Sequence, residues 1–526
     1  MTLGSPTQNE IKRVLLAHPD ITEVALITEE GIDGRHFQIA YVVANTERMQ
    51  AAKSRLYAAE QNRRILQWRT AFDHTYRRGG GHFAPSFVGW TSNFTNKPIP
   101  EQEMSEWLDC TVKRIRNLKA KRILEVGCGV GLLVERLAPG CLTYCATDFS
   151  PVAVDRLHEF TAARPQLRHV KLLQREATDF SGLEPNSFDA VILNSVAQYF
   201  PSIEYLHDVL QQAVRVAAPG GHVFVGDVRD LGLLRTFHGA VQLAKAPPLA
   251  SIGWLKRKIS LAIEQERELV VDPVFFLGLS RSIRSLTGAD VLLKRGSNNE
   301  LTRYRYDVLL HVDKASSSAS RQAVEMQADS AAPEELLLRI SREQIPAVRL
   351  LDVPNSRIAV DLAAVRSLWC ADGRRSIKDL TRQNAQCSAD GSDPEAFWRI
   401  GDSSGYNVLV GCSPDSTEGR FDVALADRRH SLVAPSLCRE ATDPWTVDGR
   451  PVATDPMAAA FMQQLGLEFG DVLRSQFPEE QQPAAVIAVN KIPLGDMTEE
   501  PSLVPQIAPD DARWFDHAQY IADRSR

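Results

Sequence analysis

A glycine-rich loop at residues 127–131 is the clearest candidate for chemistry in this sequence. The apolar run "ILEV" ends at Val126 and is followed by a glycine at every second position, Gly127, Gly129 and Gly131. Glycine lets a strand turn sharply into a helix while backbone N–H groups stay open to a ligand. Leu132 stands where the dinucleotide pattern G-x-G-x-x-G needs a glycine. The loop therefore argues against a nicotinamide cofactor and leaves a nucleoside-binding loop or a plain strand-to-helix turn.

An acidic residue follows the next expected strand. The run 143–147 is typical of a short buried strand that ends at Asp148, and Ser150-Pro151 has the pattern of a helix start. A carboxylate about 20 residues beyond a glycine loop is where a ribose diol would be bound. This spacing favours a nucleoside site.

Two further strand ends carry polar side chains. Glu176 follows a third expected strand, and Asn194-Ser195 ends a fourth, at residues 190–193. The carboxyl ends of parallel strands meet at one edge of a sheet, where ligands of open α/β folds bind. Four consecutive strand ends of this kind favour the nucleoside site over a plain turn.

Composition limits the class of protein. The chain has 526 residues, which is too long for one hydrophobic core and predicts two or more domains. A charged fraction of 24% and a formal net charge of −6 indicate neither nucleic-acid binding nor a polybasic membrane patch. The eight cysteines form no C-x-x-C pair and no cluster with metal-ligand spacing. No signal peptide or membrane-length apolar run is present, so we expect a cytoplasmic enzyme with reduced thiols and no metal.

The chain divides into zones of different pattern. A small α+β fragment is followed by a helical connector, and "RRGGGHF" then marks a joint before a long βαβ alternation that closes with two strands. A polar, Ala/Ser-rich linker separates this region from a mixed helical and strand region. The expected boundaries are 1–48, 49–78, 79–313, 314–335, 336–500 and a tail at 501–526.

The whole sequence resembles the methyltransferase inserts of nonribosomal peptide synthetases and their polyketide relatives. The resemblance is carried by "GWTSNFTNKPIPEQEMSEW", "ILEVGCGVGLL", "TDFSP", "LLQREATDFSG", "VILNSVAQYFPSIEYL", "PGGHVFVGDVRDLGLLRTFHGAVQL" and "NELTRYRYDVLLHV". It implies an α/β fold: a class I, Rossmann-like methyltransferase sheet inserted in a small α+β adenylation-type subdomain. Residues 1–48 and 336–500 would be the two halves of that subdomain and would meet in space.

The resemblance implies S-adenosyl-L-methionine as the cofactor. Asp148 would bind the ribose and Glu176 the adenine amino group, and Trp90, with Phe94, would belong to a lid. The cofactor-binding residues it implies are Glu125, Gly127, Cys128, Gly129, Gly131, Asp148, Phe149, Ser150, Glu176, Ala177, Thr178, Asn194 and Trp90.

The sequence also departs from complete adenylation domains. No large ATP-binding core precedes residue 1, and Pro493-Leu494 is followed by "GDMTEE" in place of a lysine-bearing turn. No carrier-protein serine motif follows residue 500. We therefore expect no amino-acid activation, and a substrate delivered on an acyl or peptidyl carrier protein of another chain.

The acceptor atom depends on the available bases. Methyl transfer needs the nucleophile in line at roughly 3 Å, and a hydroxyl needs a general base whereas an amine only has to be neutral. His238, Glu300 and Tyr199 are the catalytic candidates; the alternatives are a structural histidine, an ion pair of Glu300 with Arg303 or Arg305, and a core tyrosine. Asn298 replaces a histidine that the family often has before Glu300.

Three functions stay open. We expect methylation of an oxygen on a carrier-bound or small acyl substrate, because a chain without an adenylation core does not itself select an aminoacyl amine. The alternatives are N-methylation of an aminoacyl-carrier substrate and a non-catalytic scaffold or docking protein.

Overall fold

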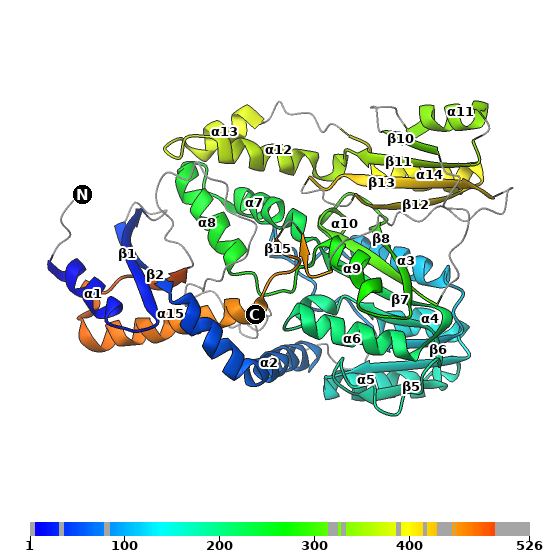
Figure 1. The fold of residues 1–526 in the computed structure, drawn as a ribbon, viewed down its shortest axis with the longest axis horizontal. Coiled ribbons are helices and arrows are strands. Elements are labelled where there is room, and N and C mark those ends of the chain that lie inside the picture. Colours follow the sequence, from blue (N-terminus) through cyan, green and yellow to red (C-terminus); the bar gives the residue numbers. More distant parts are fainter. Residues whose placement is uncertain are drawn as a thin grey trace.

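A computed structural model gives the fold (Figure 1). It describes residues 6–30, 36–77, 85–313, 324–327, 333–343, 345–384, 391–413, 418–428, 444–447 and 449–489. The "RRGGGHF" joint after Arg77, most of the expected linker, the turn at Pro493-Leu494 and the tail lie outside these ranges.

A mostly parallel sheet forms the centre of the molecule. Its strands are β3 (Arg122–Val126), β4 (Thr143–Asp148), β5 (Val170–Gln174), β6 (Phe188–Asn194), β7 (Ala217–Arg229), β8 (Leu286–Leu293) and β9 (Arg305–Val312). Their spatial order is β8-β9-β7-β6-β3-β4-β5, with β9 antiparallel to both of its neighbours. The chain order reverses between β3 and β6, which is where an open α/β sheet binds its ligand.

Helices cover both faces of this sheet because its strands are apolar on both sides. In β3, Leu124 faces one hydrophobic core and Ile123 faces the other. The first core includes α6 (Ile203–Val216) and α9 (Pro273–Gly278), and the second includes α3 (Glu101–Arg116), α4 (Leu132–Leu137) and α5 (Pro151–Ala162). The α/β, class I type of architecture expected from the sequence is confirmed.

Further helices follow β7 and lie beyond the carboxyl edge. They are α7 (Leu234–Lys245) and α8 (Ile252–Glu264), with the short α10 (Glu300–Arg303) before β9. A satellite core joins α8 to α12 (Ser356–Cys370) and α13 (Ile377–Asn384). This layer brings α12 and α13 against the helices that follow β7.

The sheet continues into the third zone of the chain. Strands β10 (Val324–Gln327), β11 (Ala347–Val353), β13 (Phe421–Asp427) and β12 (Tyr406–Cys412) extend it to eleven strands within the described residues. The junction is a pairing of Gly411 with Leu292. Helices α11 (Pro333–Glu343) and α14 (Pro394–Ser404) pack on these strands.

A separate three-stranded sheet joins the two ends of the described chain. It contains β1 (Ile21–Glu30), β2 (His36–Ala44) and β16 (Ala485–Val489), with β16 parallel to β2. Helices α1 (Pro6–Leu16) and α15 (Pro456–Gln476) share its core. Of the zone 336–500, only α15 and β16 lie in this unit, whereas the sequence placed the whole zone there. Strands β11, β12 and β13 of that zone instead extend the large sheet beside β8, and their apolar residues form a core with α11 and α14.

Helix α2 (Thr46–Arg77) runs from the three-stranded sheet to the large sheet (Figure 1). A short β14–β15 ribbon (Thr446–Val447 and Arg450–Pro451) lies between the two parts in sequence. Among the helices in the described ranges, none combines the length and the apolar character needed to cross a bilayer.

Candidate functional site

The glycine loop adopts backbone conformations that only glycine tolerates well. Gly127, Gly129 and Gly131 have φ values of 76°, 48° and 82°. A Cβ on Gly127 would lie 2.5 Å from Val196, and one on Gly131 would clash with Leu157. The loop therefore holds its N–H groups at the end of β3 without room for side chains.

Asp148 lies at the end of β4, directly against this loop. Its Oδ2 accepts a hydrogen bond from the Gly129 N–H at 2.8 Å, and its Oδ1 accepts one from the Ser150 N–H at 2.9 Å. Burial raises the pKa of Asp148 to about 6, although these two N–H groups lower it. The carboxylate is ionised at neutral pH and keeps lone pairs for ligand hydroxyls.

The residues that follow Asp148 are also placed at this edge. Ser150 caps α5 by accepting from the Ala153 N–H, and its hydroxyl donates to Asp73 at 2.5 Å. The Phe149 ring lies 6.2 Å from the ring of Phe72. Through these two contacts, α2 covers one side of the carboxyl edge of the sheet.

Two expected cofactor residues face the interior. Glu125 is 3% exposed and accepts a hydrogen bond from the Tyr144 hydroxyl at 2.6 Å. Burial raises the pKa of Glu125 to about 8. Cys128 is buried, and burial raises the pKa of its thiol well above the ordinary value. The side chains of Glu125 and Cys128 are therefore buried beneath the glycine loop. Of these two residues, only Cys128 contributes its backbone to the loop.

The segment after β5 lies at the rim. Glu176 and Thr178 are exposed, while Ala177 packs against the first core. The Glu176 carbonyl accepts from the Asp179 N–H at 3.0 Å and so shapes a turn. An exposed carboxylate in this position is open to a ligand amino group.

Asn194 ends β6 and carries an unsatisfied acceptor. Its Nδ2 donates to Ser195 Oγ at 3.2 Å, whereas its buried Oδ1 has no hydrogen-bond partner among the described residues. A Cβ on Gly226 of β7 would collide with that oxygen. Buried acceptors are almost always paired, so Asn194 Oδ1 has the character of a ligand contact. The glycine loop, Asp148 and this acceptor fit a nucleoside that bears hydroxyl and ammonium donors.

A buried ion network that the sequence reasoning missed supports Asn194 and Ser195. Ser195 has a φ of 56°, and its hydroxyl donates a hydrogen bond to Asp227 Oδ2 at 3.1 Å. Asp227 also accepts hydrogen bonds from the Arg305 guanidinium at 2.5 Å and from the Trp107 indole N–H at 3.2 Å. Burial alone would raise the pKa of Asp227, but Arg305 and Lys294 hold it below the usual range. A lone acid inside the apolar run "HVFVGDV" was the available signal.

His238 lies on α7 in a second ionic cluster. Its Nε2 is 3.0 Å from Glu266 Oε2, and Glu266 is 2.8 Å from Arg229, which also pairs with Glu268 at 2.8 Å. The Arg229 guanidinium lies 4.8 Å from the Phe237 ring centroid. Glu266 is buried, and the Arg229 guanidinium and the His238 hydrogen bond nonetheless hold its pKa below the usual range. The structure therefore brings His238 to a carboxylate that is already neutralised by an arginine.

Glu300 anchors the segment before α3. Its Oε1 accepts from the Asn93 backbone N–H at 2.9 Å and from Asn93 Nδ2 at 2.7 Å. Arg303 pairs with Asp361 at 3.2 Å rather than with Glu300. The segment that Glu300 holds carries Trp90, whose ring lies 4.9 Å from that of Trp107.

Tyr199 belongs to an aromatic cluster with α2. Its ring lies 4.6 Å from Trp68 and 5.0 Å from Phe72, and burial raises the pKa of its hydroxyl above the ordinary value. From sequence, α2 was expected only as a connector. The aromatic residues Trp68, Phe72 and Tyr76 at helical spacing were a signal that it has a buried face.

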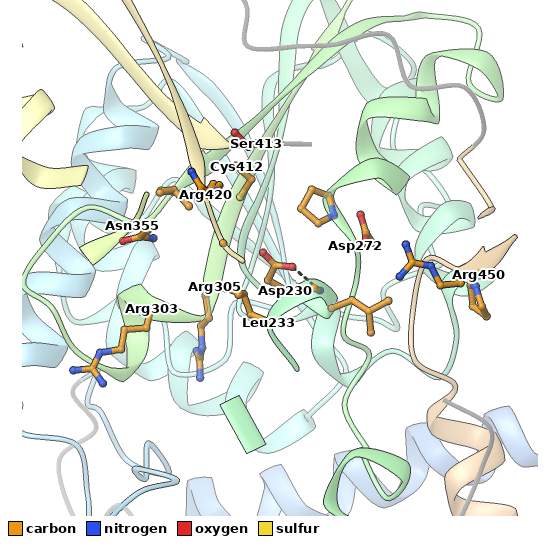
Figure 2. Close-up of a pocket in the computed structure, with 16 residues that line it drawn as sticks. Asp230, Leu233, Asp272, Arg303, Arg305, Asn355, Cys412, Ser413, Arg420 and Arg450 are labelled. Carbon is orange, nitrogen blue, oxygen red and sulfur yellow. Dashed lines mark hydrogen bonds between the residues drawn. The ribbon is translucent and has the colours of Figure 1, made fainter. Parts of the chain in front are cut away.

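A cavity opens next to the carboxyl end of β7 (Figure 2). Asp230 and Asp272 face it from the methyltransferase-like part, and Arg420 faces it from the third zone. Burial and the neighbouring Asp272 raise the pKa of Asp230 to about 8. Arg305, which binds Asp227, also lines the cavity, so the cavity adjoins the edge that carries Asn194.

Comparisons with known proteins agree with this geometry. A family model described as "Methyltransferase domain" matches residues 124–223, which include the glycine loop, Asp148 and Asn194. Chondramide synthase cmdD of Chondromyces crocatus is 33% identical over 92% of this chain, and the probable non-canonical nonribosomal peptide synthetase CymA of Salinispora arenicola is 32% identical over 92%. The chain spans only 12% and 6% of the lengths of these two relatives.

Solved structures are more distant. The N-methyltransferase NodS of Bradyrhizobium japonicum, in complex with S-adenosyl-L-homocysteine, is 16% identical, and the match covers 46% of this chain and 99% of that one with a TM-score of 0.28.

Proposed function

Because this chain contains an S-adenosyl-L-methionine-dependent methyltransferase domain of nonribosomal peptide synthetase type, we propose that it methylates the amine nitrogen of an aminoacyl or peptidyl group held on a carrier protein. This proposal replaces the oxygen acceptor expected from the sequence. It rests above all on the similarity, over 92% of this chain, to a probable nonribosomal peptide synthetase, a class of enzyme that handles aminoacyl groups. The two candidate bases each have a partner in the structure, Glu266 for His238 and Asn93 for Glu300.

An amine acceptor also requires no general base. A neutral amine attacks a methyl group directly, whereas a hydroxyl needs a base to take its proton in the transition state. The cofactor supplies an electrophilic methyl group when bound. The protein then contributes mainly orientation and a dry environment.

The residues at the sheet edge have separate roles in this proposal. Asp148 accepts hydrogen bonds from the ribose hydroxyls, and Asn194 Oδ1 accepts one from a ligand ammonium or amine. Ser195 is held by Asp227, so the end of β6 keeps a fixed shape beside the acceptor. Glu300 holds the Trp90 segment over the edge and excludes water there.

We assign the acyl part of the substrate to the cavity of Figure 2. The cavity shares Arg305 with the edge and is lined by Leu233. Leu233→Phe should therefore raise KM for the acyl substrate and leave affinity for S-adenosyl-L-homocysteine unchanged. If Leu233→Phe and the wild type had equal KM values for the acyl substrate, the acyl group would not occupy this cavity.

A matched pair of substrates tests the acceptor atom. Aminoacyl and 2-hydroxyacyl thioesters with the same side chain, loaded on a carrier protein, are incubated with cofactor labelled in its methyl group, and fragmentation mass spectrometry locates the label. The proposal predicts label on the nitrogen and little on the hydroxyl. Preferential O-labelling would restore the oxygen acceptor, and no transfer to either would favour a docking protein.

A further inference from the structure

The C-terminal half of α2 lies against the cofactor edge, although it is far from it in sequence. Phe72 contacts Phe149 and Tyr199, and Trp68 contacts Tyr199. Arg156 of α5 donates to the carbonyl of Arg77 at 3.1 Å. The helix therefore packs on the elements that follow β4 and β6.

Tyr76 of α2 lies close to the glycine loop. A Cβ on Gly129 would lie 3.1 Å from the Tyr76 hydroxyl oxygen, so that oxygen lies directly over the loop. The Tyr76 ring stacks on Phe72 at 5.7 Å. Burial, followed by the charge of Asp148, holds the pKa of Tyr76 well above its ordinary value, so its hydroxyl is a donor at all working pH values.

We propose that α2 is part of the cofactor site, with the Tyr76 hydroxyl available to donate a hydrogen bond to an oxygen of a cofactor bound at the glycine loop, and with Asp73 holding the helix there through Ser150. This inference rests on the proposed function, because it takes the cofactor site as given. It assigns a binding role to residues outside the matched region 124–223. Two features of the structure support it: the position of the Tyr76 hydroxyl over the loop and the hydrogen bond from Ser150 to Asp73.

The other half of α2 is fixed to a different part of the molecule. Arg63 donates to Gln464 of α15 at 2.9 Å, and Arg64 donates to the Arg267 carbonyl. The Arg267 guanidinium in turn donates a hydrogen bond to the side-chain oxygen of Gln463 of α15. One helix thus connects the unit of the three-stranded sheet with the glycine loop.

Calorimetric titration with S-adenosyl-L-homocysteine tests the role of Tyr76. Tyr76→Phe keeps the ring packing and removes only the hydroxyl, and it should weaken binding about tenfold. Gln67→Ala, on the exposed face of the same helix, should bind like the wild type. Equal affinities of Tyr76→Phe and the wild type would overturn the inference, whereas absence of binding by the wild type would overturn the proposed function itself.

The Asp73 contact needs its own measurement. Asp73→Ala and Ser150→Ala should each weaken binding, and the double variant should be no weaker than the worse single variant, because the hydrogen bond from Ser150 to Asp73 is already absent in each single variant. Additive losses would show that Asp73 does not act through Ser150. Unfolding midpoints of all variants separate loss of binding from loss of folding.

Discussion

The backbone N–H of Gly129 donates to Oδ2 of Asp148 at 2.8 Å, so the glycine loop of β3 and the acid that ends β4 form one structural unit. The bond orients the carboxylate and leaves lone pairs for a ligand. It also joins two sequence signals that lie 19 positions apart. A change in the conformation of the loop at Gly129 would therefore also displace the carboxylate of Asp148.

Cofactor affinity should fall at acidic pH. The pKa of Asp148 in the free protein is raised to about 6, mainly by burial, and ligand hydroxyls donate best to the ionised form. Affinity for S-adenosyl-L-homocysteine should be constant above pH 7 and decline by up to about tenfold per pH unit below about pH 6. Asp148→Asn should bind weakly with a flat profile between pH 5 and 8; a declining profile in this variant would assign the titration to another group.

Glu125→Gln should change how stability depends on pH. The folded protein keeps Glu125 protonated up to about pH 8, while the unfolded chain ionises near pH 4.5, so the wild type loses stability as pH rises through this window. Glutamine still accepts from Tyr144 and does not ionise. In urea unfolding, the free energy of unfolding of Glu125→Gln should rise relative to that of the wild type between pH 5 and pH 8. The exposed control Glu101→Gln should show no such rise. A difference between Glu125→Gln and the wild type that is constant with pH would contradict the raised pKa of Glu125.

His238→Gln should lower kcat by less than tenfold. In the structure His238 contacts Glu266, which retains Arg229 as a partner when the histidine is removed. A general base would cost about 10²–10⁴-fold and would remove a pH-dependent step from the rate profile. Single-turnover rates from pH 6 to 9 distinguish these cases, and a loss above a hundredfold would return His238 to the role of base.

Glu300→Ala should loosen the segment that carries Trp90. The substitution removes an acceptor of two hydrogen bonds from Asn93, whereas Glu300→Gln retains an acceptor oxygen. We expect the alanine variant to show faster amide hydrogen exchange at residues 90–95 and a higher KM, with the glutamine variant close to the wild type. If glutamine were as damaging as alanine, the charge of Glu300 would matter more than the anchor.

The sequence predicted the parts of the site that follow a repeating local rule. Each polar residue at a strand end, such as Asp148 and Asn194, could be placed because parallel strands bring their carboxyl ends together. The roles of His238 and Tyr76 could not be placed, because their partners Glu266 and Gly129 come from segments 28 and 53 positions away, and no periodic pattern specifies such a contact.

The third zone shows the same limit. Strand and helix patterns in residues 336–500 were recognisable, but the pairing of Gly411 with Leu292, which joins β12 to β8 of the large sheet, follows no local pattern. The parallel pairing of β16 with β2 is likewise set by tertiary packing. The hydrophobic pattern of the sequence predicts helices and strands, whereas the partner of each strand is determined by tertiary packing.

Calorimetric titration of the wild type and Asp148→Ala with S-adenosyl-L-homocysteine measures whether Asp148 binds the ribose of the cofactor. We expect one binding site in the wild type and affinity weaker by about 1.5–3 kcal/mol in the variant, because a buried hydrogen-bond acceptor for the ribose is lost. Wild-type affinity in Asp148→Ala, or no binding by the wild type, would contradict this expectation.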